Sequence, residues 1–182
     1  MSLDLINYER DNFVQSCKRL SIVPSHQFLI ISISQQKLFL FSNELLVKSY
    51  TLSTSINKPS CLKDSFGTPL GLHKIAEKIG DGVEKGTVFK ARIAQDYTYW
   101  EAPISEQSEN LITSRIIRIK GLDPELNLHG DHDSFNRYIY IHGTNHEDQL
   151  GKPFSKGCIE LSNDDCIALF ECVQLGSLIW IE

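Results

Sequence analysis

The chain has 182 residues and a net charge of −5, with 41% hydrophobic and 23% charged residues. This composition is typical of a globular protein, and the length is enough to bury a core without disulfide or metal staples. The acidic balance and the lack of a long Lys/Arg cluster exclude the basic footprint of a nucleic-acid-binding protein. No apolar run approaches the roughly 20 residues that span a bilayer, so we expect no transmembrane segment.

An amphipathic helix is predicted over residues 3–20. Its apolar positions recur at helical spacing: Leu3, Ile6, Phe13, Cys17 and Leu20. Pro24 closes the segment. We expect this helix to form an N-terminal extension, residues 1–27, that packs on the outside of a domain over residues 28–182.

From residue 28 the sequence favours β-strands. An isoleucine-rich stretch, 28–34, precedes a hairpin, and later β-favouring stretches follow at 87–93, 114–120, 137–141 and 177–181. One helix is expected after Ser162, because serine is a good N-cap and acids follow it. The apolar stripe of this helix comprises Cys166, Leu169, Phe170 and Val173. The predicted fold class is therefore mainly β, with one helix near the end of the chain.

The residues that carry chemistry lie between 141 and 163. His142 follows a predicted strand, and Cys158 lies in the turn Ser155-Lys156-Gly157-Cys158. A thiol attacks as thiolate and needs a partner that accepts its proton, which a histidine at a strand end provides. Gly157 permits a tight turn that exposes the thiol and points backbone N–H groups at an oxyanion, and the charge of Lys156 favours the thiolate. These residues make a catalytic Cys/His pair a hypothesis without proving it.

The same residues resemble a known signature. His142-Gly143-Thr144 followed by Ser155-Lys156-Gly157-Cys158-Ile159 is similar to the motif of the L,D-transpeptidase (YkuD-type) catalytic domain. That motif is a His-Gly pair, a spacer, and Ser-(His or Lys)-Gly-Cys with an apolar residue next. The likeness continues in SISQQKLFLFSNELLVKSYTLSTS, TPLGLHKIAEKIG, GTVFKARI, LITSRIIRIKGL and RYIYIHGTN, which resemble the family's strands. It covers residues 28–182 and leaves only the N-terminal helix outside.

The resemblance implies a β-sandwich-like catalytic domain that acts on peptidoglycan stem peptides. Cys158 is implied to attack the amide between a diamino acid and D-alanine, which releases D-alanine and forms an acyl-enzyme. An amine of a second stem peptide then forms a cross-link. His142 is implied as the base, oriented through its other ring nitrogen by the carbonyl of Gly143. No metal or organic cofactor is implied, and carbapenem-type β-lactams are implied inhibitors.

The candidate substrate-binding residues are Tyr138, Ser155, Lys156, Gly157 and Glu160. Lys156 stands where many members of the family have histidine, and Glu160 stands where arginine is usual. Arginine can grip a carboxylate, whereas Glu160 would repel one and could pair with Lys156. The alternative is that Glu160 stabilises the helix that follows it. Tyr138 and Tyr140 are expected to alternate on one strand face, so that Tyr138 packs across strands or touches substrate.

Three functions stay open. Beside the transpeptidase stand an L,D-carboxypeptidase, in which water replaces the amine, and a catalytically weak module that binds peptidoglycan fragments, for which Glu160 is the only support. Charged residues interrupt positions 1–20, so they do not resemble a signal peptide. We therefore expect the chain as written to be cytoplasmic, unless a non-classical route exports it to the periplasm or wall. A cytoplasmic location favours the carboxypeptidase.

The other cysteines and histidines are expected to be structural or exposed rather than catalytic. There are five cysteines and no CxxC pair, which fits a reducing compartment. Cys17, Cys166 and Cys172 are expected in the core, and Cys61 on the surface of a polar loop. A zinc site formed by His129, His132, His142 and His146 is disfavoured. The spacing from His142 to His146 contains a glycine, follows a strand and lacks the glutamate of the metalloprotease helix motif.

Overall fold

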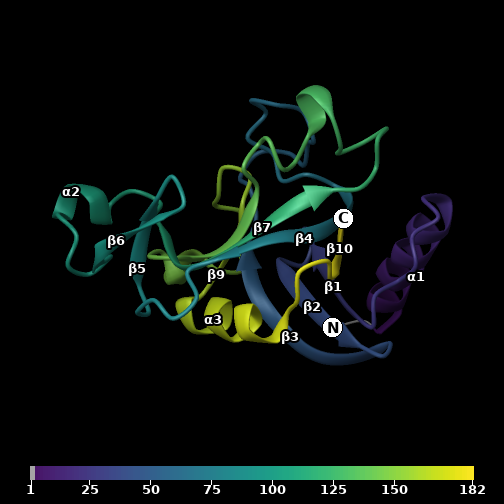
Figure 1. Ribbon diagram of the computed structural model, residues 1–182, viewed down its shortest axis with the longest axis horizontal. Coiled ribbons are helices and arrows are strands. Elements are labelled where there is room, and N and C mark those ends of the chain that lie inside the picture. Colours follow the sequence, from purple (N-terminus) through teal and green to yellow (C-terminus); the bar gives the residue numbers. More distant parts are fainter. Residues whose placement is uncertain (1–2) are drawn as a thin grey trace.

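The computed structural model of the protein describes residues 3–182, with side chains from residue 8 onward (Figure 1). Within these residues one sheet has the strand order β4-β10-β1-β2-β3-β9-β8-β7-β5-β6. The strands are β1 Gln27–Ser32, β2 Lys37–Ser42, β3 Leu45–Ser53, β4 Gly71–Ile79, β5 Thr87–Lys90, β6 Ile93–Thr98, β7 Ile112–Gly121, β8 Tyr140–Thr144, β9 Ile159–Leu161 and β10 Leu178–Ile181. The helices are α1 Leu3–Arg19, α2 Ile104–Gln107 and α3 Asn163–Cys172, with 3₁₀ turns η1 Gly130–His132 and η2 Glu147–Gln149.

The sheet closes on itself because β4 pairs with both β10 and β7. Its two halves therefore face each other across a shared core, as in a sandwich. The β5–β6 hairpin lies outside this closure and extends from β7 at one end of the molecule, and α1 lies at the opposite end (Figure 1). The prediction of a mainly β, sandwich-like domain with one helix after Cys158 and one at the N-terminus is confirmed.

The central strands bury both of their faces. Leu29 and Ile31 of β1 point into the main core, whereas Phe28 and Ile30 point into a second apolar cluster under α1. Successive side chains of a strand alternate between faces, so a strand covered on both sides needs apolar residues throughout. This explains why the isoleucine-rich segment shows no polar alternation.

Helix α1 packs on the outer face of the sheet at β1 and β4. Phe13 stacks on Phe28 with ring centroids 4.4 Å apart, and Phe28 stacks on Phe41 at 4.9 Å. Cys17 is buried beside them, as predicted. The predicted apolar positions Leu3 and Ile6 lie among the residues whose side chains are not described.

Helix α3 fills the inner side of the sheet. The Ser162 hydroxyl accepts a hydrogen bond from the backbone N–H of Asp165 at 3.1 Å, which confirms the predicted N-cap. Cys166 and its apolar stripe lie in the main core. The prediction for Cys172 is wrong, because that thiol is exposed. Six positions after Cys166, it lies about 240° further around the helix, away from the core.

Three further predictions are wrong: those for Cys61, for the strand over 137–141 and for the two tyrosines in it. Cys61 is buried, because the loop folds back and its sulfur accepts from Leu70 N at 3.3 Å. The strand expected over 137–141 begins only at Tyr140. Tyr138 has a φ of 57° and is 52% exposed, whereas Tyr140 is buried. The left-handed residue breaks the alternation, so the two tyrosines do not share a strand face.

Candidate active site

The pairing of β8 with β9 brings the two halves of the motif together. The strands are parallel, with Ile141 beside Ile159 and His142 beside Glu160. Cys158 immediately precedes β9 and therefore lies level with Tyr140. Residues far apart in the chain thus become neighbours across one pair of strands.

His142, Cys158 and Glu160 belong to one side of this strand pair. Ile141 and Ile159 point into the main core, so the alternating side chains point to the opposite face. On that face Cys158 packs against a small apolar cluster of Phe89, Ile116 and Tyr140. The thiol is therefore in contact with mostly apolar side chains. His142 and Glu160 lie on the same face, two positions further along β8 and β9.

The turn before Cys158 is held by Ser155. The buried Ser155 hydroxyl donates to the carbonyl of Cys158 at 2.6 Å and accepts from the N–H of Gly157 at 3.2 Å. Gly157 has a φ of +123°, which glycine alone adopts readily, and a Cβ there would meet the Ile139 side chain at 3.4 Å. The Gly157 N–H is engaged by Ser155, so an oxyanion bound at this turn would need another backbone N–H.

The surroundings of the Cys158 thiol raise its pKa. Cys158 is part-exposed, and its Sγ donates weakly to the Tyr138 carbonyl at 3.7 Å. Desolvation raises the thiol pKa to about 12; the negative charge of Glu160 raises it as well, and the positive charge of Arg137 acts against them. Arg137 is therefore the cation that acts on the sulfur. Lys156, expected in that role, has an exposed side chain.

His142 is held in one orientation from behind. Its Nδ1 lies 2.8 Å from the carbonyl oxygen of Gly143. A carbonyl can only accept, so Nδ1 carries the proton and Nε2 is left as the basic nitrogen. The side chain is only 3% exposed, and burial lowers the pKa of His142 to about 4. Among the described residues, no hydrogen bond joins His142 to the Cys158 thiol.

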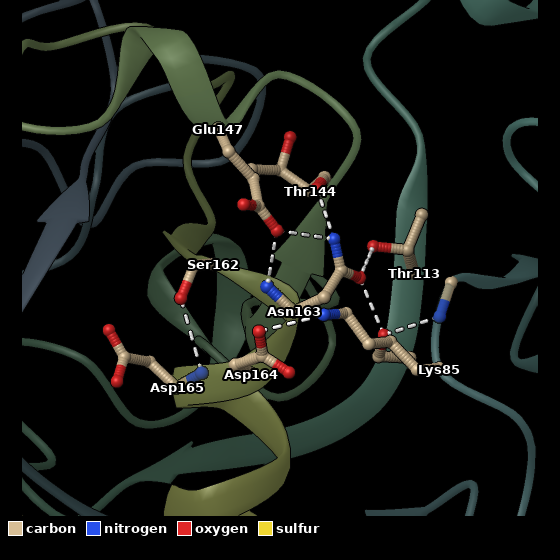
Figure 2. A network of polar contacts seen from close by, with 10 residues as sticks. Lys85, Thr113, Thr144, Glu147, Ser162, Asn163, Asp164 and Asp165 are labelled. Carbon is tan, nitrogen blue, oxygen red and sulfur yellow. Dashed lines mark hydrogen bonds and ion pairs between the residues drawn. The ribbon is translucent and has the colours of Figure 1, made fainter.

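Gly143 lies close to Thr113 and Asn163. These two residues belong to a polar network that joins β7, β8 and α3 (Figure 2). Asn163, the first residue of α3, donates to the Thr144 carbonyl at 2.8 Å and to the Glu147 carboxylate at 2.7 Å. Its carbonyl oxygen accepts from the Thr113 hydroxyl at 2.7 Å. The Glu147 carboxylate also accepts from the Asn163 backbone N–H at 2.8 Å. The network fixes the strand end that carries the Gly143 carbonyl.

Glu160 is a buried acid beside this pair. It is 2% exposed, and the amide of Asn110 donates to its carboxylate at 2.6 Å. Burial raises the pKa of Glu160 to about 7. Glu160 thus pairs with Asn110 rather than with Lys156, and it lies within β9 rather than in the first turn of the helix.

A depression of about 270 Å³ opens beside the Cys158 turn. Tyr138, Ile139 and Lys156 form one part of its lining, with Arg137 behind them. Arg137 also donates to the Gly67 carbonyl at 2.8 Å and so ties down the facing loop. Sequence reasoning found Tyr138 and Lys156 and missed Arg137 and Asn110. No motif marks those two residues, because only the folded register brings them to the site.

The structure gives no support to a metal site among the described residues. His129 and His132 are exposed; His129 precedes η1 and His132 is its last residue. Within the described part of the chain, no group of three or more His, Cys, Asp or Glu side chains is arranged to hold a metal ion. None of the described helices is long and apolar enough to cross a membrane.

Comparisons with known proteins point in one direction. The family model described as the L,D-transpeptidase catalytic domain, YkuD, matches residues 26–181. The chain is 44% identical over 45 residues to the "Putative L,D-transpeptidase YqjB" of Bacillus subtilis (strain 168), which is 25% of this chain and 26% of that protein.

Solved structures share the fold. An L,D-transpeptidase from Mycobacterium smegmatis is 18% identical, with a TM-score of 0.53, and the match covers 86% of this chain and 58% of that one. L,D-transpeptidase 3 from Mycobacterium tuberculosis, in complex with a faropenem-derived adduct, is 16% identical with a TM-score of 0.54, covering 86% and 60%. The chain thus spans less than two thirds of these relatives.

Proposed function

Because the chain belongs to the L,D-transpeptidase catalytic domain family, we propose that it transfers acyl groups of peptidoglycan stem peptides through a thioester on Cys158. The observation that carries the proposal is the register of β8 and β9, which sets Cys158 and His142 on one face of one strand pair. The shared fold with enzymes trapped as β-lactam adducts supports it.

The proton is transferred during attack rather than before it. The pKa of Cys158 is about 12 and that of His142 about 4, so the resting pair is a thiol and a neutral imidazole at neutral pH. When the sulfur attacks the substrate carbonyl, the S–C bond forms and the thiol proton passes to Nε2 of His142. The Gly143 carbonyl stabilises the imidazolium through Nδ1–H.

The second half of the cycle reverses these transfers. The tetrahedral intermediate collapses, the C–N bond breaks, and the departing amine of D-alanine takes the proton from Nε2. An amine of a second stem peptide then attacks the thioester and gives its proton to His142. Expulsion of the sulfur restores the thiol and leaves a cross-link. Water in place of the amine gives L,D-carboxypeptidase activity by the same steps.

Product analysis on a disaccharide tetrapeptide separates these outcomes. Mass spectrometry should detect a cross-linked dimer together with released D-alanine. Release of D-alanine without a dimer would assign the carboxypeptidase instead. No change in the substrate would contradict both activities and favour a binding module.

Acylation by a carbapenem tests the nucleophile directly. Incubation should add one carbapenem mass to the chain, and peptide mapping should place it on Cys158. Cys158→Ala should remove the adduct, whereas Cys172→Ala, which removes an exposed thiol outside the site, should leave it. An adduct on Cys61 or Cys172 with Cys158 free would overturn the assignment.

A further inference from the structure

Three arginines lie beside the residues that border Cys158, and in two of them both terminal NH2 groups of the guanidinium donate to protein partners. Arg118 forms an ion pair with Glu77 at 3.1 Å and donates to the Phe135 carbonyl at 2.9 Å. Arg137 donates to two backbone carbonyls in the loop before β4. The third, Arg92, lies at the tip of the β5–β6 hairpin.

Arg92 has most of its hydrogen-bonding capacity left. Its guanidinium donates to the Tyr140 hydroxyl at 3.2 Å and lies over the Tyr138 ring, 4.9 Å from the ring centroid. Among the described residues it forms no ion pair, and its side chain is part-exposed. A guanidinium carries five N–H donors in a planar fork that matches a carboxylate. Arg92 can therefore bind a carboxylate without losing a protein partner.

The hairpin turn fixes where this guanidinium lies. Lys90 pairs with Ile93, so Ala91 and Arg92 form a two-residue turn with φ values of 47° and 69°. Such turns favour glycine and asparagine, because a side chain at positive φ crowds the backbone. The contacts to Tyr138 and Tyr140 hold Arg92 in this conformation and keep its charge over the tyrosines.

The tyrosines connect Arg92 to the nucleophile. Tyr140 packs with Cys158 in one apolar cluster, and the Tyr138 carbonyl accepts from Cys158 Sγ at 3.7 Å. A carboxylate on Arg92 would thus be separated from the sulfur by a single side chain. At the other end, two residues further along the strands, lies Glu160. Glu160 is an acid whose carboxylate already accepts from Asn110, so it offers an anionic group no donor, and among the described residues Arg92 is the cation with free donors on this side of the nucleophile.

We propose that Arg92 binds the terminal carboxylate of the acyl-donor peptide and so selects donors with a free C-terminus. The inference rests on the proposed acyl transfer and adds the residue that orients the leaving amino acid. The carboxylate accepts two N–H bonds from the guanidinium, while the scissile carbonyl approaches Cys158 over the Tyr140 side chain.

Two donor tetrapeptides that differ only in a free or amidated C-terminus test this proposal. In Arg92→Gln, kcat/KM for the free acid should fall about 10- to 100-fold, the usual effect of losing a charge-assisted hydrogen bond, with little change for the amide. Arg92→Lys should retain part of the preference, because it keeps the charge without the fork. Arg10→Gln, which removes a part-exposed arginine on the distant α1, is the matched control. It should leave kcat/KM unchanged for both peptides.

Peptide binding to Cys158→Ala, measured by calorimetry, provides a readout that needs no turnover. Adding Arg92→Gln to this variant should weaken binding of the free acid by a similar factor and leave the amide unchanged. An equal loss for both peptides would assign Arg92 a packing role and overturn the proposal, as would no change in either. Absent turnover with Arg92-dependent binding would overturn the acyl transfer alone. Absent turnover without such binding would overturn both.

Discussion

Replacing Gly143 with alanine tests whether the strand that carries His142 must stay in close contact with its neighbours. A Cβ at this position would lie 2.8 Å from the Thr113 carbonyl oxygen and 2.9 Å from Asn163 Oδ1. Neither atom can move aside, because one is backbone in the middle of the sheet and the other is held by buried hydrogen bonds. The strand β8 must shift instead, and the Gly143 carbonyl that orients His142 shifts with it.

The magnitude follows from the crowding. Overpacking of this kind destabilises a protein by about 1–3 kcal/mol, which in a chain of this size lowers Tm by roughly 2–12 °C. A misplaced general base lowers the rate by up to about 10²–10⁴-fold. Calorimetry measures the first effect. Mass spectrometry of carbapenem acylation at Cys158, at a temperature where Gly143→Ala is folded, measures the second.

Gly82→Ala is the control for a change in stability alone. Gly82 has a φ of +70° with no atom near its Cβ position, so alanine there is destabilising only through its backbone conformation. The expected loss is about 1–2 kcal/mol, with the acylation rate preserved. If Gly143→Ala kept both the wild-type Tm and the wild-type acylation rate, the argument that Gly143 positions His142 would be refuted.

Three further changes have defined outcomes. His142→Ala should slow carbapenem acylation of Cys158 by about 10²–10⁴-fold, measured by stopped-flow or mass spectrometry, and an unchanged rate would mean that another group takes the proton. Burial raises the pKa of Glu160 from 4.5 to about 7, so the folded state binds the extra proton and stability falls as pH rises through that window. The free energy of unfolding of Glu160→Gln, measured with urea, should therefore match that of the wild type near pH 4.5. Above pH 7 it should exceed that of the wild type by up to about 3 kcal/mol; a difference independent of pH would contradict this. Asn163→Ala should lower the free energy of unfolding by about 2–4 kcal/mol because it leaves buried partners unpaired, whereas Asp164→Ala, which removes an exposed ion pair with Lys85, should cost less than about 1 kcal/mol.

Much of the fold followed from sequence pattern. The hairpin formed by β2 and β3, the late strands and α3 with its Ser162 cap are local features, and local propensity decides them. The predicted start of the strand at 137–141 was wrong, because the β-favouring residues include Tyr138, which tertiary contacts hold in a left-handed conformation. The prediction that Cys61 is exposed was wrong for a related reason, since a polar loop can still fold back over a thiol.

The motif located the candidate reacting residues but not their surroundings. Arg92, Asn110 and Arg137 come from three separate loops and turns and reach the site only through strand register and hairpin geometry. A single sequence without its register carries no signal for such residues. For the same reason the sequence placed Glu160 correctly just before the helix N-cap at Ser162 but did not show that it lies beside His142.

The protonation states of the pair depend on burial more than on nearby charge. Sequence reasoning placed the cation Lys156 next to Cys158 and expected a thiolate. In the structure desolvation dominates both groups, raising the thiol pKa and lowering the imidazole pKa, so each is neutral at rest. A neutral thiol is a weaker nucleophile than a thiolate, so the proposed mechanism couples attack by Cys158 to transfer of its proton to His142. If this coupling holds, His142→Ala should slow acylation by an acyl donor more than it slows alkylation by iodoacetamide, because only the acyl donor accepts the sulfur while the proton passes to Nε2.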